Sequence, residues 1–412
     1  MSATIRFTPL GAEFRADPYP QYRRLREHRP VHKTLGTWVL TRHADVQAVL
    51  RDRTFSADLI PQLVRKQAGR VSDADVARIE RLGRKSLVFT DNPDHARLRG
   101  LVNRVFTAQA VAALRPLVEK VAGELLDRAL PTGRADVIEA FSAPLPVTVL
   151  SEWMALPAGL REHVGHWTHD VRFLLEPGLL RGDDFAHVCA VVEDFVAALG
   201  EVLVHRRANP GDDLISRLLA TETGGGDRLA DEELIFVCLM CFVAGNETTK
   251  SLLGNGFHAL ARHPEQAALL RARPELVPAA VQEMLRYDCP LQLTKRLATR
   301  DVEVGGELVR EGDQVLLCLG SANRDPEVFA RPDEFDVTRD AHGHLAFGHG
   351  MHGCLGGLLA ELQAEVAVEQ LLRRTERLDL DLDFDGAEVE YQDHSFIVRG
   401  PRSLPLSFGA TR

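Results

Sequence analysis

The segment AFGHGMHGCLGGLLAEL, residues 346–362, places two histidines, one cysteine and five glycines in its first twelve positions. Such residues suit a zinc site, a phosphate-binding loop or the seat of another cofactor. Structural zinc ligands usually form two separated pairs, with two to four residues within each pair and often with several thiolates. That spacing is not present here and argues against zinc, although donors are available at His342, His344, His349, His352 and Cys354.

A phosphate-binding loop and a site for another cofactor would need the glycines at different positions. A phosphate-binding loop would need glycines directly after a strand, followed by Lys-Ser/Thr or a third spaced glycine, and neither arrangement is present. Cys354 instead stands on glycine-rich backbone just before a helix that is expected to begin near Leu355. The amide groups and dipole of a helix N-terminus favour a thiolate there. A single thiolate shielded by Phe347 suits haem iron.

A second polar segment, VAGNETTKS, follows the apolar run Leu234–Gly245. It places Glu247 and Thr248 in the middle of a predicted helix, where buried polar groups are costly unless they are paired. The Thr248 hydroxyl can bond to the carbonyl of Ala244 and open the helix, where Ala244 and Gly245 leave room for a flat cofactor. The simpler alternative is a threonine-rich helix surface.

Two further charged pairs have helical spacing. Glu283 and Arg286 stand three residues apart, which lets them form an ion pair, and at a surface such a pair contributes little. His95 and Arg99 stand four apart on one helical face and could together bind a carboxylate. Ordinary surface charges are the default explanation for this second pair.

The elements that must position these residues are mostly helical. Short strands are expected near residue 40, over 301–319 with a turn at Gly305–Gly306, and in HSFIVRGPRSLPLSF near the C-terminus. Because the candidate residues come from many parts of the chain, we expect one domain over residues 1–412. Apolar residues at three-and-four spacing predict helices over 19–28, 43–51, 94–106, 109–129, 183–207, 231–262, 264–287 and 357–374.

Composition narrows the class of protein. The 412 residues are 45% hydrophobic and 26% charged, with a formal net charge of −10, so nucleic acid is not an expected partner. The N-terminal segment lacks the apolar core of a signal peptide, and the longest apolar run is too short to span a membrane, so we expect a cytoplasmic protein. Cys238 and Cys241 form a C-x-x-C inside that apolar run, which predicts core cysteines.

FGHGMHGCLGG resembles the haem-binding signature F-G-x-G-x-H-x-C-x-G of the cytochrome P450 superfamily. The resemblance implies that Cys354 is the proximal ligand of the iron and that His352 contacts a haem propionate. Glu361 stands where the family often carries arginine, which changes the local charge where a redox partner would dock. The matching positions are Phe347, Gly348, Gly350, His352, Cys354 and Gly356.

Three more segments resemble the same superfamily. Glu283 and Arg286 match its E-x-x-R pair, and ANRDPEVFARPDEFDVTRD, residues 322–340, matches the segment linked to that pair, which implies a structural role. VAGNETT matches A-G-x-[DE]-T-T, so Thr248 would take part in oxygen activation and Glu247 would relay protons from solvent. Positions that bind propionates in the family are matched by His95, Arg99 and Arg296.

The resemblance implies a mainly α cytochrome P450 fold, a large helical bundle with small β-sheets. Haem b, the iron protoporphyrin IX, would lie buried between the helix that carries Thr248 and the loop that carries Cys354. The implied activity is that of a monooxygenase of the bacterial soluble class, as in secondary metabolism. It would insert one atom of O2 into an apolar small molecule by hydroxylation or epoxidation. Electrons would come from NAD(P)H through a ferredoxin or flavodoxin and its reductase.

Family topology also implies a substrate pocket, lined in part by Phe242, Leu291, Leu293 and Ile397 and by a loop with Leu82. The segment 172–185, with a bend at Pro177–Gly178, is expected to form part of a mobile lid. A terpenoid, steroid, fatty acid or polyketide would suit such a pocket equally. A haem-thiolate peroxygenase or isomerase, or a haem-binding module without turnover, is the alternative function.

Overall fold

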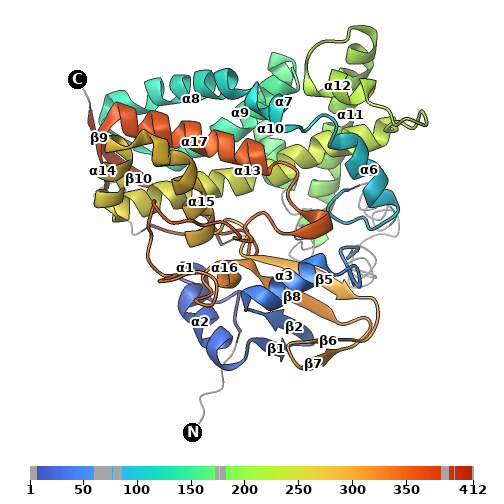
Figure 1. Ribbon diagram of the computed structural model, residues 1–412. Helices are drawn as coiled ribbons and strands as arrows, with labels where there is room; N and C mark the ends of the chain where they lie inside the picture. The colour runs from blue at the N-terminus through green and yellow to red at the C-terminus, as the bar shows by residue number, and fades with distance from the viewer. Residues whose placement is uncertain are drawn as a thin grey trace. The chain divides into compact units, whose positions relative to one another are not determined.

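The computed structural model describes residues 7–59, 77, 86–171, 176, 182–381, 389–393 and 395–410. Leu82, the Pro177–Gly178 bend and most of the expected lid lie outside these ranges. The described chain is mainly helical, with three small sheets, as the sequence predicts (Figure 1). It forms two compact units, of which unit 1 comprises Met1–Ser56, Val118–Leu145 and Thr248–Arg412, and unit 2 comprises Ala57–Leu117 and Pro146–Glu247. The single domain expected over residues 1–412 stays a prediction.

Unit 1 contains a five-stranded sheet in the order β1-β2-β8-β5-β3. The sheet is antiparallel except between β2 and β8, where Val39 pairs with Leu316 in parallel register. A separate hairpin, β6 and β7, turns at Gly305 and Gly306, which both have positive φ, as the sequence predicts. The strands are β1 (Val31–Thr34), β2 (Thr37–Leu40), β3 (Phe55–Ser56), β5 (Leu293–Ala298), β6 (Val302–Val304), β7 (Glu307–Val309) and β8 (Gln314–Cys318).

A second part of unit 1 is helical. In it α17 packs against α15 and α14 (Figure 1). The side chain of Gln370 on α17 donates to the backbone carbonyl of Glu119 on α8. A three-stranded sheet in the order β4-β10-β9 joins residues far apart in the chain. The elements of unit 1 besides its first sheet and hairpin are α1 (Ala12–Ala16), α2 (Tyr19–His28), α3 (His43–Arg51), most of α8 (Arg115–Ala129), short helical turns at Leu130–Thr132, Ile138–Ser142, Pro274–Leu276 and Gly350–His352, β4 (Arg134–Asp136), the second half of α13 (Asp231–Arg262), α14 (Pro264–Ala272), α15 (Val277–Tyr287), α16 (Leu319–Ala322), α17 (Gly357–Arg374), β9 (Thr375–Leu380) and β10 (Pro405–Ala410).

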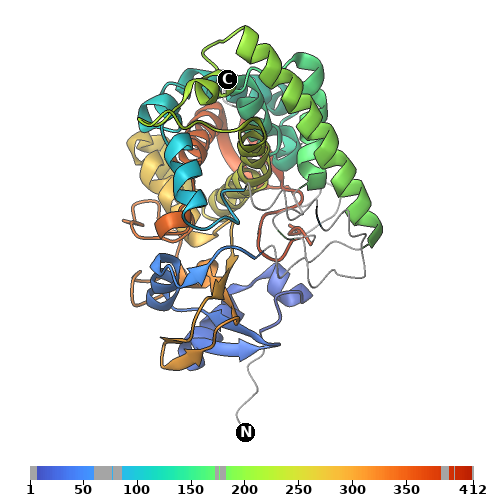
Figure 2. The ribbon, with the colours of Figure 1, turned by 90° about the vertical axis from the view of Figure 1, so that its right-hand side faces the viewer.

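Unit 2 is built from helices that pack through an aromatic cluster. The rings of Trp167 on α10 and Phe195 on α11 lie 5.2 Å apart, and that of Phe242 on α13 lies 5.7 Å from Phe195. Figure 2 shows α11 as the long green helix. The helices are α6 (Asp94–Val102), α7 (Ala108–Ala112), most of α9 (Pro144–Trp153), α10 (Ala158–Val171), α11 (Gly182–Ala208), α12 (Leu214–Ala220) and the first half of α13 (Asp231–Arg262).

Two predicted helices are wrong in their continuity, and proline explains both breaks. Residues 264–287 form α14 and α15, separated by a short turn at Pro274–Leu276, because Arg273, before Pro274, takes a non-helical conformation with φ −135° and ψ 71°. Residues 109–129 likewise divide into α7 and α8, and Pro116 is the second residue of α8. By contrast, α13 and α17 have the predicted bounds.

The long helix α13 begins with Asp231, Glu232 and Glu233, and acidic residues in a first turn stabilise a helix. It is α-helical to Arg262, so the opening predicted at Ala244 is not seen in its secondary structure. Cys238 is buried as predicted, whereas Cys241 is only half-buried. Among the described residues, no helix has both the length and the apolar character that crossing a membrane requires.

Candidate active site

Cys354 is held in a tight turn that leads into α17. Its backbone N–H donates to the carbonyl of Phe347 at 2.8 Å, which closes a loop containing the short helical turn Gly350–His352. The helix itself begins at Gly357, the first residue of the predicted range 357–374 and two residues after Leu355. Of the cysteines described by the structure, only Cys354 is exposed. It is therefore the thiol best able to bind an external group.

Glycine is required in this turn at some positions by the backbone conformation and at others by the lack of room for a side chain. Gly348 and Gly350 have φ of 68° and 73°, in the left-handed region that favours glycine. A Cβ at Gly350 would also lie 2.7 Å from the carbonyl oxygen of Leu50 on α3. The ring of Phe347 lies 3.5 Å from where a Cβ on Gly357 would be, so this ring covers the start of α17. Only a residue without a side chain at position 350 allows the turn to pass so close to α3.

The histidines before the turn do not assemble a metal site. Within the described ranges, no three His, Cys, Asp or Glu side chains are grouped to hold a metal ion. His344 instead joins a chain of hydrogen bonds, in which its Nε2 lies 2.9 Å from Oε1 of Gln282, and Nε2 of Gln282 donates to Glu361 at 2.9 Å. Its Nδ1 accepts from the backbone N–H of Ala346 at 3.2 Å. His344 thus fixes the loop before Phe347 rather than a metal.

We expect His344 to make the protein less stable in acid. Burial, assisted by the nearby His342, lowers the pKa of His344 from 6.5 to about 4. Between these values the unfolded chain binds the extra proton and the folded protein does not, so the free energy of unfolding falls as pH falls from 6.5 to 4. Wyman linkage puts this loss at up to about 3 kcal/mol. Urea unfolding at several pH values measures it.

The variant His344→Gln keeps a donor for Gln282 but cannot titrate in this range. Its unfolding free energy should change less between pH 6.5 and pH 4 than that of the wild type. His28→Gln is the control, because His28 is exposed and should leave the wild-type pH dependence intact. Equal slopes for wild type and His344→Gln would contradict the assignment.

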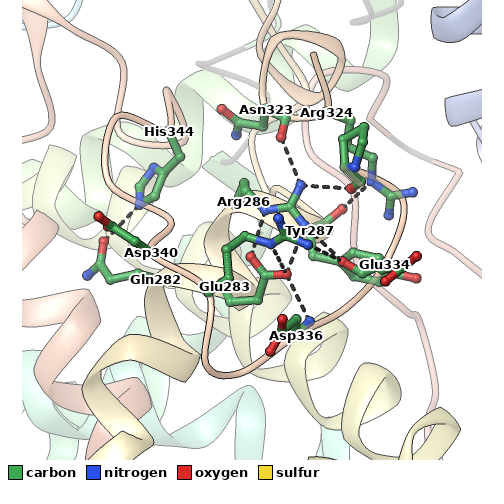
Figure 3. A network of polar contacts seen from close by, with 12 residues as sticks. Gln282, Glu283, Arg286, Tyr287, Asn323, Arg324, Glu334, Asp336, Asp340 and His344 are labelled. Atoms are coloured by element: carbon green, nitrogen blue, oxygen red, sulfur yellow. Dashed lines mark hydrogen bonds and ion pairs between the residues drawn. The ribbon is translucent and has the colours of Figure 1, made fainter. Parts of the chain in front are cut away.

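Glu283 and Arg286 form a buried ion pair, not a surface one. The carboxylate accepts from Arg286 Nε at 2.6 Å and from Nη2 at 2.8 Å, and both side chains are 0% exposed (Figure 3). Arg339 Nε also donates to Glu283 at 3.1 Å. The Glu283 carboxylate thus has a bidentate contact with Arg286 and a single contact with Arg339, so it has charged partners on two sides. The alternative of a surface ion pair is therefore wrong.

The remaining donors of Arg286 connect α15 to the loop that precedes Cys354. Its Nη1 donates to the carbonyls of Asn323 at 3.0 Å and Pro332 at 2.8 Å (Figure 3). Asn323 in turn accepts, through Oδ1, from the backbone N–H of Leu345 at 2.6 Å. The ion pair thus reaches, through two hydrogen bonds, to within two residues of Phe347. This contact of Asn323 was not predicted from the sequence.

Unit 1 also contains three predicted pocket residues and one residue that is predicted to bind a haem propionate. Leu293 and Arg296 lie on β5, and both are buried. Leu291 pairs with Val398, and the backbone N–H of Gln292 donates to the carbonyl of Ile397 at 2.7 Å. Leu293 belongs to a hydrophobic core cluster against which Ile397 packs.

The part of α13 that carries Glu247 and Thr248 has one face that is only half-buried. Ala244 and Thr248 are both half-buried and stand four residues apart, on the same helical face, whereas Glu247 is 4% exposed. Gly245 is half-buried too, and a Cβ there would lie 3.5 Å from Leu150. Phe242, one turn before, is fully buried in the aromatic cluster of unit 2.

The helix α6 carries His95 and Arg99 as predicted. His95 is 2% exposed, and Arg99 Nε donates to Asn103 at 2.9 Å. Arg97, between them in sequence, was not predicted to matter, yet it forms ion pairs with Asp227 at 2.9 Å and Glu233 at 2.8 Å. Hydrogen bonds to Glu233 and Asp227 hold the pKa of Arg97 above its usual value. They fasten α6 to the first turn of α13 within unit 2.

The chain is similar to known proteins over nearly its whole length. The family model of cytochrome P450 matches residues 181–381. The cytochrome P450 monooxygenase PikC of Streptomyces venezuelae is 38% identical over 96% of this chain and 92% of its own length. The 6-deoxyerythronolide B hydroxylase of Saccharopolyspora erythraea is 36% identical over 95% of this chain and 96% of its own length. The crystal structure of CalO2 superposes with a TM-score of 0.89 at 35% identity and covers 99% of this chain and all of that one.

Proposed function

This chain belongs to the cytochrome P450 family and is a monooxygenase, and we propose that Cys354 supplies the thiolate of its haem. The observation that carries the proposal is the position of Cys354. It is the one exposed thiol among the described cysteines, and it stands in a glycine turn directly before α17. Amides at a helix start favour the thiolate form.

The residues that the resemblance assigns to the haem are of the types that suit a flat cofactor with two carboxylates. The half-buried face of Ala244 and Thr248 carries only small side chains, and Gly348 and Gly356 leave backbone without side chains near the sulfur. Arg99 and Arg296 would offset the charge of the propionates, and charge-assisted hydrogen bonds of this kind are the strong ones. His95 and His352 would contact the same carboxylates. Phe347 would shield the sulfur. When bound, the haem supplies thiolate-ligated iron that activates O2 for transfer to a C–H or C=C bond.

We assign proton handling to Glu247 and Thr248. Thr248 sits on the partly uncovered face of α13, and its hydroxyl can donate to and accept from a group on that face. Glu247 is its direct neighbour in sequence, and a carboxylate there can pass protons onward from solvent.

Thr248→Ala is expected to uncouple electron consumption from product formation. NAD(P)H oxidation should continue, whereas product formed per NAD(P)H should fall by about 10²-fold, the usual contribution of a positioned proton donor. Product and hydrogen peroxide are quantified together against NAD(P)H. Thr248→Ser, which keeps the hydroxyl, should retain most of the coupling. Unchanged coupling in Thr248→Ala would remove Thr248 from the mechanism.

The substrate we propose is an apolar small molecule that is hydroxylated or epoxidised. The predicted pocket residues Phe242, Leu291, Leu293 and Ile397 are all apolar. Because a relative is a 6-deoxyerythronolide B hydroxylase, 6-deoxyerythronolide B is the first compound to test. A panel that adds terpenoids, steroids and fatty acids is titrated against the haem protein, and the low-spin to high-spin absorbance change identifies a ligand.

Electrons are proposed to come from NAD(P)H through a ferredoxin or flavodoxin and its reductase. Product formation that requires these partners and O2 supports this assignment. Product formation with hydrogen peroxide alone, and none with the reconstituted partners, would instead identify a peroxygenase.

A further inference from the structure

Within unit 1, two segments are joined like strands although they lie far apart in the chain. Arg399 N–H donates to the carbonyl of Pro290 at 2.8 Å, and Gln292 N–H donates to that of Ile397 at 2.7 Å. Leu291 and Val398 pair between them. We call residues 289–293 and 396–399 the paired wall. It contains Leu291, Leu293 and Ile397, the pocket residues of unit 1.

A buried carboxylate lies directly beside the paired wall. Asp288 Oδ1 accepts from Arg399 Nε at 3.0 Å and from the Tyr19 hydroxyl at 2.8 Å. Asp288 Oδ2 lies 3.4 Å from the hydroxyl of Tyr391, whose ring is stacked 3.5 Å from the Arg399 guanidinium. Asp288 and Arg399 are 8% and 9% exposed. Water therefore screens this ion pair little, and its geometry is tightly constrained.

The same cluster ties the wall to the N-terminal helices. Arg399 donates through both terminal nitrogens, to the carbonyls of Arg15 and Ala16. Tyr19, on α2, also accepts from Gln292 Nε2 at 3.2 Å, so its hydroxyl contacts both the carboxylate and the wall. Asn255 on α13 donates to the backbone carbonyls of both Asp288 and Arg399. Three separate elements thus hold one short stretch of backbone.

We propose that Asp288, Arg399 and Tyr19 are positioning residues that set the shape of the substrate pocket through the paired wall. None of the three is a catalytic residue, since each acts through the backbone of Leu291 and Ile397. The inference rests on the proposed function, in which those two residues line the pocket. It goes beyond that function by naming the charges that fix the lining residues.

Two haem-iron ligands of different size test the proposal. Imidazole reports access to the iron alone, whereas a bulky azole such as clotrimazole must also fit the pocket walls. In Tyr19→Phe and Asp288→Asn holoenzymes, Kd for the bulky azole should rise about 3- to 30-fold, as for other networks that couple distant positions. Kd for imidazole and the spectrum of the reduced carbonyl complex should stay as in the wild type.

Tyr22→Phe is the matched control. Tyr22 lies on the same helix and in the same core cluster as Tyr19, is fully buried, and its hydroxyl has no hydrogen-bond partner among the described residues. Its removal should leave both Kd values unchanged. Tyr19→Phe retains every carbon atom of the core, so it keeps the test valid if Asp288→Asn fails to fold.

Ile397→Ala separates this inference from the proposed function. If Ile397→Ala alters the bulky-azole Kd while Tyr19→Phe and Asp288→Asn behave like Tyr22→Phe, the positioning role is overturned and the pocket assignment stands. If Ile397→Ala has no effect, the pocket assignment fails and the inference falls with it. If the chain binds no haem, the proposed function fails before either question arises.

Discussion

Cys354→Ser is expected to abolish the red-shifted Soret band of the reduced carbonyl complex, and all monooxygenase turnover with it. A serine hydroxyl has nearly the shape of the thiol but does not ionise near neutral pH, so it cannot donate the same electron density to iron. Absorbance of the reduced, carbon monoxide-treated protein measures the effect directly. Haem content is determined in parallel, because weakened ligation also lowers haem retention.

The control for this result is a cysteine that is placed differently. Cys189 on α11 is buried, so Cys189→Ala should leave the carbonyl spectrum unchanged. Circular dichroism shows whether each variant is folded. A folded Cys354→Ser protein with the wild-type carbonyl band would mean that another group ligates the iron.

Arg286→Gln is expected to cost about 3–5 kcal/mol in the free energy of unfolding, the usual effect of leaving one partner of a buried ion pair uncompensated. The variant strands the Glu283 carboxylate in a site where both side chains are 0% exposed. It also removes the donors that hold the carbonyls of Asn323 and Pro332. Urea unfolding followed by circular dichroism measures the loss.

The chain offers a closely matched control for this second prediction. Arg331 and Glu334 also stand three residues apart with an N–O distance of 2.6 Å, but their side chains are 65% and 57% exposed. Arg331→Gln should therefore change the unfolding free energy by about 0–1 kcal/mol, as for surface pairs. Similar losses in the two variants would show that burial does not set the strength of the Glu283–Arg286 pair.

The long regular elements could be predicted from sequence because hydrophobic periodicity alone defines them. The bounds of α13 and α17 were predicted to the residue, since each has a continuous apolar stripe and charged or glycine residues at its start. The strand β5 was not predicted. Its sequence, LTKRLA, carries two adjacent cations, and only pairing with β8 and β3 makes it a strand. Sheet pairing is a property of two segments, so one segment does not reveal it.

The residues of the candidate site likewise fall into those that the sequence predicts and those that it does not. Cys354 and its glycines could be found from sequence because the whole constellation lies within eleven residues. Arg97 gave no signal, because its partners Asp227 and Glu233 are more than a hundred residues away and ordinary in type. The burial of Glu283 and Arg286 likewise could not be predicted from the sequence. Spacing shows that two charges can meet, but the exclusion of water depends on the segments that cover them.

The contact between Arg399 and the carbonyls of Arg15 and Ala16 has a consequence for the order of events during synthesis on the ribosome. These partners are separated by 384 and 383 positions in the chain. Likewise β4, at residues 134–136, pairs with β10, at 405–407. Unit 1 therefore cannot close while its last segment is still in the ribosomal tunnel, and its early helices must wait with apolar residues such as Tyr22 and Leu25 exposed. The early helices therefore depend on segments made more than 380 residues later to complete their packing.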